Sequence, residues 1–368
     1  MPGTDDLTST LTVPTAAVHA VHDLLTEAAS ADGFSGSVHV VQGSEVLLDA
    51  GYGVASRRWG SPVTTATRFD VASVTKLFTA VAVLQQVEAG RLDLDAPITD
   101  VVDLTGTTIT SAVTLRHLLT HTSGIGDDAD EEAGEAYEDL WLERPCHTVT
   151  STADFLPQFA HKPSNFAPGT GCRYCNVGYV LAGLALEAVT GTTYREHVLE
   201  HVLARAGMTS SGFFDMRDAV PDVAEGWDPV RDPDGVVTGW RSNIFCYPPI
   251  GSPDGGAHAT PRDLVRFLDA VRGGDLLGPE LTAAFLTPQV THHESDGRTV
   301  RYGFGLEFVV LADGSVRSLT KDGINAGASA VLRHYPANDV TVALVSSSED
   351  GAWGPFRRID GLLGPATP

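Results

Sequence analysis

The chain has 368 residues, of which 42% are hydrophobic, and a formal net charge of -23. A chain of this length can bury a sizeable core, and so negative a surface repels nucleic acid and anionic membranes, so we expect neither as a partner. No stretch approaches the ~18 consecutive apolar residues that a membrane-spanning helix needs. Residues 1–6 lack the pattern of a signal peptide, which predicts a cytoplasmic protein.

The first predicted elements lie in the N-terminal 50 residues. Apolar side chains at helical spacing predict an amphipathic helix over residues 15–30. Alternating apolar and polar residues predict strands at 37–41 and 46–48, joined by a turn at Gly43 and Ser44.

The next predicted helix carries the first chemical motif, Ser73-Val74-Thr75-Lys76. Apolar residues at 77, 80, 81, 84 and 87 recur at helical spacing, and Gly90 is expected to end the helix, so Ser73 lies in its first turn. Side chains three residues apart share a helix face, so the Lys76 amine can reach the Ser73 hydroxyl. Burial and the helix dipole favour a neutral amine, which can accept the serine proton.

An acidic stretch and a turn-rich loop follow. Residues 127–132 and 138–139 are mostly acidic and predict a solvated surface loop. In the later loop Tyr174 and Asn176 flank one residue just before an apolar helical pattern, where a phenol near an ammonium can carry a proton. Cys172 and Cys175 in the same loop could indicate a zinc site or a redox pair, but no second ligand pair has suitable spacing. We therefore expect no metal and no cofactor.

The C-terminal part returns to strands, predicted at residues 305–310, 330–333 and 340–345, with a short helix near 356–359. Strands at both ends with helices between them predict an α/β (α+β) fold, an antiparallel sheet flanked by helices with a mostly helical insert. We expect residues 1–69 and 300–368 to form the sheet domain and 70–299 the mainly helical domain. The active site would lie at their junction.

The motifs occur in an order that resembles a known superfamily. Ser73-x-x-Lys76, Tyr174-x-Asn176 and Lys321-x-Gly323 are similar to the three signature elements of serine β-lactamases and penicillin-binding proteins. The strings at 118–124, 168–170, 255–264 and 302–305 look like those of its class C-like branch, which contains class C β-lactamases, D-specific peptidases and family VIII carboxylesterases. The resemblance spans residues 15–350 and implies a β-lactamase/transpeptidase-like fold.

The resemblance also implies roles. Ser73 would be the acylated nucleophile, Lys76 its base, and Tyr174 the acid that protonates the leaving group and later activates water. Asn176 would position Lys76 and the substrate. Lys321 would stabilise the tyrosine phenolate by its charge, and the backbone N–H of Ile324, after Gly323, would complete an oxyanion hole with that of Ser73.

One departure bears on substrate. The family often has Thr or Ser between the lysine and glycine of its third element, where the hydroxyl helps to bind a carboxylate, but this chain has Asp322. Asp322 would repel a substrate carboxylate if it faces the pocket, although adjacent strand residues point to opposite sides. Cys175 is expected to line the pocket. His121 is expected to be a structural turn residue, and His258 to border the pocket.

We therefore expect a serine hydrolase that cleaves a small ester or amide. A β-lactamase or D-peptidase, an acyltransferase and a non-catalytic binding relative are the alternatives. The residues leave open the acyl group, the leaving group and the oligomeric state.

Overall fold

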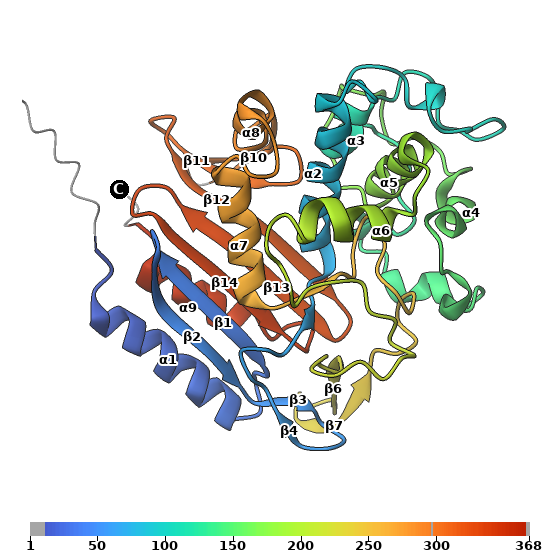
Figure 1. Ribbon diagram of the computed structural model, residues 1–368. Helices are drawn as coiled ribbons and strands as arrows, with labels where there is room; N and C mark the ends of the chain where they lie inside the picture. Colours follow the sequence, from blue (N-terminus) through green and yellow to red (C-terminus); the bar gives the residue numbers. More distant parts are fainter. Residues whose placement is uncertain (1–11, 296, 366–368) are drawn as a thin grey trace, which may run out of the picture.

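The computed structural model describes residues 12–295 and 297–365. Its main feature is one antiparallel sheet of eight strands in the order β2-β1-β14-β13-β12-β11-β10-β9 (Figure 1). The strands are β1 Gly36–Gln42, β2 Glu45–Tyr52, β9 Val290–Ser295, β10 Arg298–Tyr302, β11 Glu307–Leu311, β12 Val316–Asn325, β13 Ala328–Tyr335 and β14 Val340–Ser346.

The N-terminal and C-terminal strands meet near one edge of this sheet, where β1 pairs with β14 from Gly36 opposite Ser346 to Gln42 opposite Val340. Side chains alternate between the two faces of a strand. On β14, Val342 packs in the hydrophobic cluster that contains α1 and α9, while Ala343 packs in the cluster that contains α2 and α7. Both faces of the sheet are therefore buried at β14.

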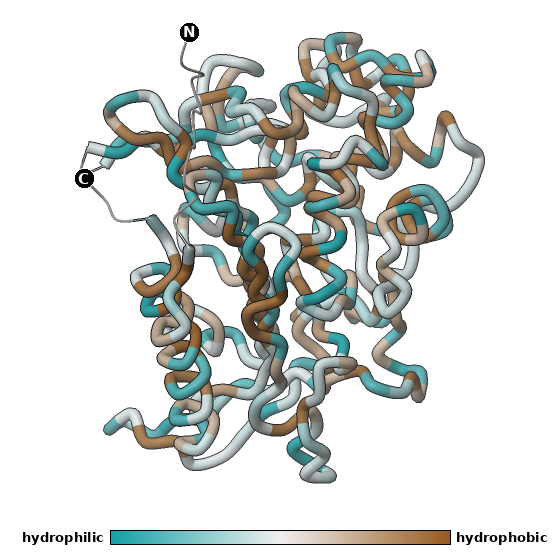
Figure 2. The backbone as a smooth tube through the Cα atoms, turned by 60° about the vertical axis from the view of Figure 1, so that its left-hand side comes forward, coloured by the Kyte–Doolittle hydropathy of each residue, from teal (hydrophilic) through white to brown (hydrophobic). Residues whose placement is uncertain are grey.

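Helices cover the two faces of the sheet. α1 Thr15–Ser30 and α9 Trp353–Leu363 contact one another on one face, and α7 Pro261–Arg272 crosses β1 and β14 on the other (Figure 1). In Figure 2 the strongly hydrophobic stretches run through the middle of the molecule.

The remaining helices gather beside the sheet, with α2 packed against α5. They are α2 Thr75–Glu88, α3 Leu115–Leu119, α4 Leu156–Phe159, α5 Val177–Thr190, α6 Tyr194–Val198 and α8 Pro279–Phe285. Short 3-10 helices span Ala72–Val74, Ile98–Asp100, Glu131–Ala133, Tyr137–Trp141, Cys146–Thr148 and Thr152–Phe155, and a π-helical turn spans Leu199–Leu203.

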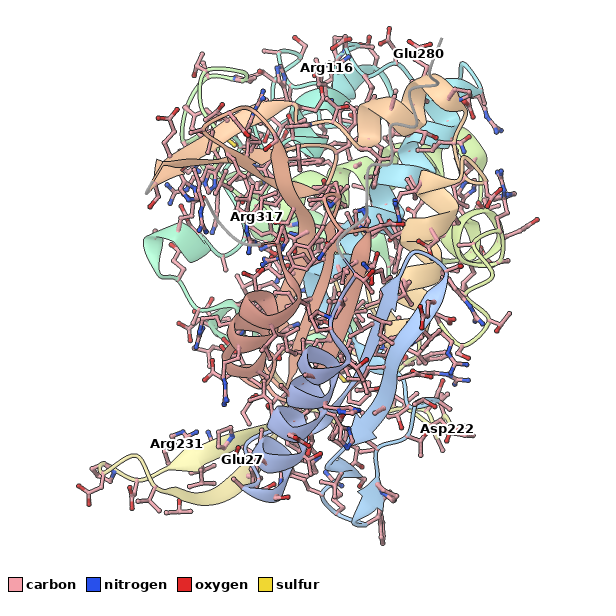
Figure 3. All side chains as sticks on the ribbon, turned by 90° about the vertical axis from the view of Figure 1, so that its left-hand side faces the viewer. Glu27, Arg116, Asp222, Arg231, Glu280 and Arg317 are labelled. Carbon is pink, nitrogen blue, oxygen red and sulfur yellow. The ribbon has the colours of Figure 1, made fainter. Side chains whose placement is uncertain are left out.

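Three small strand pairs complete the fold. They are β3 Val54–Ser56 with β4 Ser61–Pro62, β5 Phe69–Asp70 with β8 His258–Ala259, and β6 Trp227–Arg231 with β7 Val237–Ser242. The β6–β7 hairpin, which carries Arg231, projects from the body of the molecule (Figure 3).

The predicted fold class is confirmed, since an antiparallel sheet from both ends carries helices on both faces. Two details differ. Ser73 lies in the 3-10 helix Ala72–Val74 that leads into α2, rather than in the α-helix itself. The C-terminal strands of the sheet also begin earlier than expected, with β9 at Val290, so a boundary at residue 300 leaves β9 outside the sheet domain. In addition, α7, which belongs to the expected helical insert, packs on the sheet. In the part of the chain that the structure describes, no helix is long and apolar enough to cross a membrane.

Candidate active site

Ser73 lies where the start of α2 meets the end of β12. The residue before it, Ala72, has a φ of 43°, in the left-handed region that side chains other than glycine rarely adopt. The Asp70 carboxylate holds this conformation by accepting the Ala72 N–H at 2.7 Å. Backbone strain of this kind persists only where the surroundings enforce it, and it clusters at functional sites.

Lys76 is completely buried one turn after Ser73. Its Nζ lies 3.0 Å from Ser73 Oγ, 2.7 Å from Asn176 Oδ1 and 2.6 Å from the backbone oxygen of Asp254. The amine therefore connects α2, the loop before α5 and the loop before β8. A buried amine is tolerated because each of these contacts satisfies one of its hydrogen-bonding positions.

The loop before α5 is held by Asp127. Its carboxylate accepts the backbone N–H of Asn176 at 2.9 Å and that of Val177 at 3.0 Å, so it satisfies donors at the start of the helix. Asp127 is 6% exposed and the neighbouring Asp128 is 1% exposed. The expectation that this acidic stretch is a solvated surface loop is wrong at Asp127 and Asp128, since both are buried. Asp127 is buried because its carboxylate caps the start of α5.

Cys175 does not line the pocket, contrary to expectation. Its side chain is buried in the hydrophobic core, with Sγ 3.7 Å from Asp127 Oδ1. It therefore points away from Lys76, toward which the side chains of Tyr174 and Asn176 point. Cys172 points elsewhere, with Sγ 3.9 Å from the Thr120 carbonyl. Within the described residues, no group of three or more His, Cys, Asp or Glu side chains is placed to hold a metal ion.

Tyr174 lies between the two lysines. Its hydroxyl is 3.4 Å from Lys321 Nζ, and the Lys321 and Lys76 amines lie 4.7 Å and 5.0 Å from the centre of its ring. The His121 ring stacks on it with centroids 4.5 Å apart. Burial, with the positive charge of Lys321, lowers the pKa of His121 well below its usual range. The neutral ring accepts the Cys175 N–H at Nδ1, and His121 itself has a φ of 59°, as a turn residue would.

The third motif lies on a free edge of the sheet. The register of β12 with β11 ends at Thr320, whereas its register with β13 continues to Asn325. The edge left open packs against the 3-10 helix at Ser73. A Cβ at Gly323 would lie 2.4 Å from the Val71 carbonyl and 2.8 Å from Ser73 N, so only glycine lets the strand come this close. This approach brings β12 at Gly323 beside the Ser73 backbone N–H.

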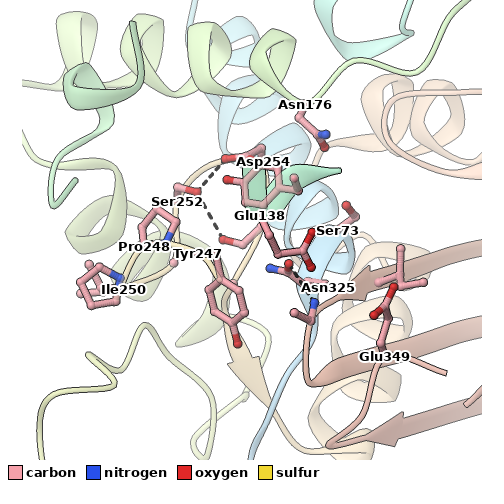
Figure 4. Close-up of a pocket in the computed structure, with 18 of the residues that line it drawn as sticks. Ser73, Glu138, Asn176, Tyr247, Pro248, Ile250, Ser252, Asp254, Asn325 and Glu349 are labelled. Carbon is pink, nitrogen blue, oxygen red and sulfur yellow. Dashed lines mark hydrogen bonds between the residues drawn. The ribbon is translucent and has the colours of Figure 1, made fainter. Parts of the chain in front are cut away.

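Two cavities flank Ser73. The first, here called the Glu138 cavity, has a volume of about 270 Å³ and is bordered by Ser73, Asn176 and His258 (Figure 4). Its other walls come from residues 135–138, 216, 247–252, 254–256, 324–326 and 349. His258 is 5% exposed on β8, and burial lowers its pKa.

The second, the Asp322 cavity, has a volume of about 280 Å³ and is bordered by Ser73, Tyr174, Lys321 and Asp322 among others. Asp322 is exposed and precedes Gly323 in β12. The face of the strand that carries Gly323 packs on the 3-10 helix at Ser73. The Asp322 carboxylate therefore belongs to the opposite face of β12.

The fold and the site together define a serine hydrolase with a β-lactamase/transpeptidase-like fold. The defining features are an antiparallel sheet, a helical part beside it, and a half-buried serine one turn before a buried lysine. The sequence matches the Beta-lactamase family over residues 23–362, and the chain belongs to that family.

Individual relatives agree with this assignment. The chain is 32% identical to esterase EstB of Burkholderia gladioli over 293 residues, which are 74% of each protein. It is similar to a penicillin-binding protein of Bacillus halodurans, with 35% identity, a TM-score of 0.85, and coverage of 93% of this chain and 100% of that one. A D-stereospecific amidohydrolase of Streptomyces sp. gives 25% identity and a TM-score of 0.72, with 90% and 94% covered.

Proposed function

We propose that this serine hydrolase cleaves a small ester or amide through an acyl-enzyme on Ser73. The observation that carries the proposal is the environment of Lys76 Nζ. Two of its neighbours, Asn176 Oδ1 and the Asp254 carbonyl, can only accept hydrogen bonds. In the neutral form that the mechanism requires, two N–H groups of the amine serve these acceptors, and its lone pair takes the Ser73 hydroxyl proton across 3.0 Å.

The remaining groups supply the other steps. Ser73 Oγ attacks the substrate carbonyl while its proton passes to Lys76, and the N–H groups of Ser73 and Ile324 stabilise the oxyanion. Tyr174 gives its proton to the leaving group, and the nearby Lys321 ammonium stabilises the resulting phenolate. A water activated by Tyr174 then hydrolyses the acyl-enzyme.

The relatives support this reaction class. One is named an esterase and another an amidohydrolase, so both ester and amide cleavage occur on chains similar to this one. Penicillin binding is the second candidate, favoured by the likeness to the Bacillus halodurans protein.

A covalent label tests the nucleophile. A fluorophosphonate should add one adduct mass to the wild type, seen by intact-protein mass spectrometry, and none to Ser73→Ala. Ser252→Ala is the matched control, since Ser252 borders the same cavity and its hydroxyl donates to Asp254 Oδ1, and this variant should still be labelled. Labelling of another serine in Ser73→Ala would refute the assignment. A panel of p-nitrophenyl esters, amino acid amides and a chromogenic cephalosporin then separates the two candidate functions.

Two further expectations accompany this proposal. A cytoplasmic location stays a proposal, and cell fractionation tests it. The division into a sheet domain and a helical domain stays a proposal, for which limited proteolysis is the test.

A further inference from the structure

The Glu138 cavity is acidic beyond what the reaction requires. Among the described residues that border it, four are acidic, namely Glu135, Glu138, Asp254 and Glu349, and none is lysine or arginine. The chemistry proposed for Ser73 uses only the backbone oxygen of Asp254 and no carboxylate of this group. Ser73, the proposed nucleophile, borders this cavity. The carboxylates are therefore expected to affect which substrates bind there.

Two of the four have partners of their own. Glu135 Oε2 accepts the Asp130 N–H at 2.9 Å and lies 3.7 Å from Lys162 Nζ. Asp254 Oδ1 accepts the Ser252 hydroxyl at 2.6 Å.

Glu138 and Glu349 are different. Glu138 is half-buried and Glu349 is exposed, and among the described residues neither carboxylate forms an ion pair with a Lys, Arg or His side chain. They come from separate elements, the 3-10 helix Tyr137–Trp141 and the turn after β14, and Figure 4 shows both reaching toward the space beside Ser73.

The two carboxylates also repel one another. Glu349 is exposed at the surface, but partial burial of its carboxylate raises its pKa, and the neighbouring charges of Asp228 and Glu138 raise it further. Like charges held together without a counter-ion lose free energy, and a bound cation restores it. The fold thus places two like charges on the walls of the same cavity.

The positive groups lie on the other side of Ser73. Lys321 borders the Asp322 cavity and not the Glu138 cavity, so it does not offset Glu138 or Glu349. The walls of the Glu138 cavity also include the apolar residues Met216, Pro249 and Ile250, which can contact alkyl groups. A cavity that has carboxylates and apolar walls, but no lysine or arginine, suits an organic ammonium group better than an anion.

We propose, resting on the function proposed above, that the substrate carries a protonated or quaternary amine, which Glu138 and Glu349 bind while its ester or amide carbonyl lies at Ser73. A substrate with a carboxylate at the same position is disfavoured by the same two groups. This assigns the substrate class as cationic esters or amides and makes Glu138 and Glu349 its specificity determinants.

Three esters with the same leaving group test this assignment. They are p-nitrophenyl 4-(trimethylammonio)butanoate, its neutral isostere p-nitrophenyl 5,5-dimethylhexanoate, and the anionic mono-p-nitrophenyl adipate. The quaternary amine keeps its charge at every pH, and the isostere has the same shape. We expect kcat/KM for the cationic ester to exceed that for the neutral one by about tenfold, or about 1.4 kcal/mol. The anionic ester should be slowest, and the ratio should fall as salt is added.

The variants locate the effect. In Glu138→Gln/Glu349→Gln the cation-to-neutral ratio should fall to about one, while Ser73 is still labelled by the fluorophosphonate, which shows an intact site. Glu280→Gln removes a carboxylate on α8 that borders neither cavity, and should keep the wild-type ratio. Asp322→Asn should also keep it.

Each failure has its own meaning. A wild-type ratio near one, with the neutral ester turned over, would overturn the cationic assignment and leave the hydrolase intact. If the cation-to-neutral ratio falls in Asp322→Asn and not in Glu138→Gln/Glu349→Gln, the assignment is overturned, because the amine then binds in the Asp322 cavity. If no ester is turned over and Ser73 is not labelled, the proposed function fails, and this inference fails with it.

Discussion

At the scale of single residues, the two lysines of the site differ in what surrounds them. Lys76 Nζ lies 3.0 Å from the Ser73 hydroxyl, whereas Lys321 Nζ lies 3.4 Å from the Tyr174 hydroxyl. In the proposed mechanism Lys76 must lose a proton to act, and Lys321 must keep its charge. Arginine stays charged at any working pH, so it can replace a lysine only in the second role.

Substitution by arginine therefore separates the two roles. Lys76→Arg should lower the acylation rate by about 10³-fold, because a guanidinium cannot accept the serine proton. Lys321→Arg should keep the rate to within about tenfold, since a positive charge remains beside Tyr174. Stopped-flow release of p-nitrophenol measures both, with circular dichroism to check folding. Equal losses in two folded variants would show that this division of roles is wrong.

At the scale of elements, the site depends on how closely β12 approaches the 3-10 helix at Ser73. Gly323→Ala would place a Cβ 2.4 Å from the Val71 carbonyl, so the strand must move and the Ile324 N–H moves with it. We expect kcat to fall by about 10²- to 10³-fold, the loss typical of one oxyanion-hole donor.

The control for Gly323→Ala is Gly354→Ala in α9, where an added Cβ meets nothing within 4 Å. This control should keep full activity and gain slightly in stability, since alanine is the better helix former. An unchanged kcat in Gly323→Ala would mean that the Ile324 peptide takes no part in the reaction.

Much of this element-level picture could be predicted from the sequence because its signals are local. Helical spacing predicted α1, at residues 15–30, and alternation predicted β1 and β14 close to their observed bounds. The Ser73-x-x-Lys76 spacing likewise placed the two side chains on one helical turn, and they lie within hydrogen-bonding distance.

What sequence reasoning missed depends on contacts between distant segments. Asp127 caps α5 across 49 residues, so its carboxylate could not be told from the exposed acidic residues beside it. Glu138 and Glu349 border one cavity although they are far apart in the chain, and no spacing rule connects them. β9 was missed because His292, His293 and Glu294 leave little apolar alternation in it.

At the scale of the whole molecule, the sheet is tied to α9 through one carboxylate. Asp360 accepts hydrogen bonds from Arg317 on β12 at 3.1 and 3.0 Å, from Arg333 on β13 at 2.8 Å and from Tyr335 on β13 at 2.6 Å. β12 also carries Lys321 and Gly323, so this anchor supports the strand that borders the site.

The anchor makes stability depend on pH. Burial alone would raise the pKa of Asp360, but the hydrogen bonds from Arg317 and Tyr335 and the charge of Arg333 lower it to about 2, from 3.8 in the unfolded chain. A depressed folded-state pKa adds stability that is complete above the unfolded value and is lost as the pH falls toward the folded one. The contribution should therefore be full above about pH 5 and decline between about pH 4 and pH 2.

Asp360→Asn should lower the free energy of unfolding by about 2 kcal/mol at pH 7, because Arg317 and Arg333 lose their charged partner while remaining partly buried. Urea denaturation of both proteins from pH 7 to pH 2 measures the difference, which should shrink at the acid end, where the wild-type carboxylate is protonated. Asp234→Asn, in the exposed turn of the β6–β7 hairpin, makes the same chemical change without these partners and should leave stability unchanged at every pH. A difference between wild type and Asp360→Asn that stays constant down to pH 2 would show that the charge of Asp360 is not what holds α9 to the sheet.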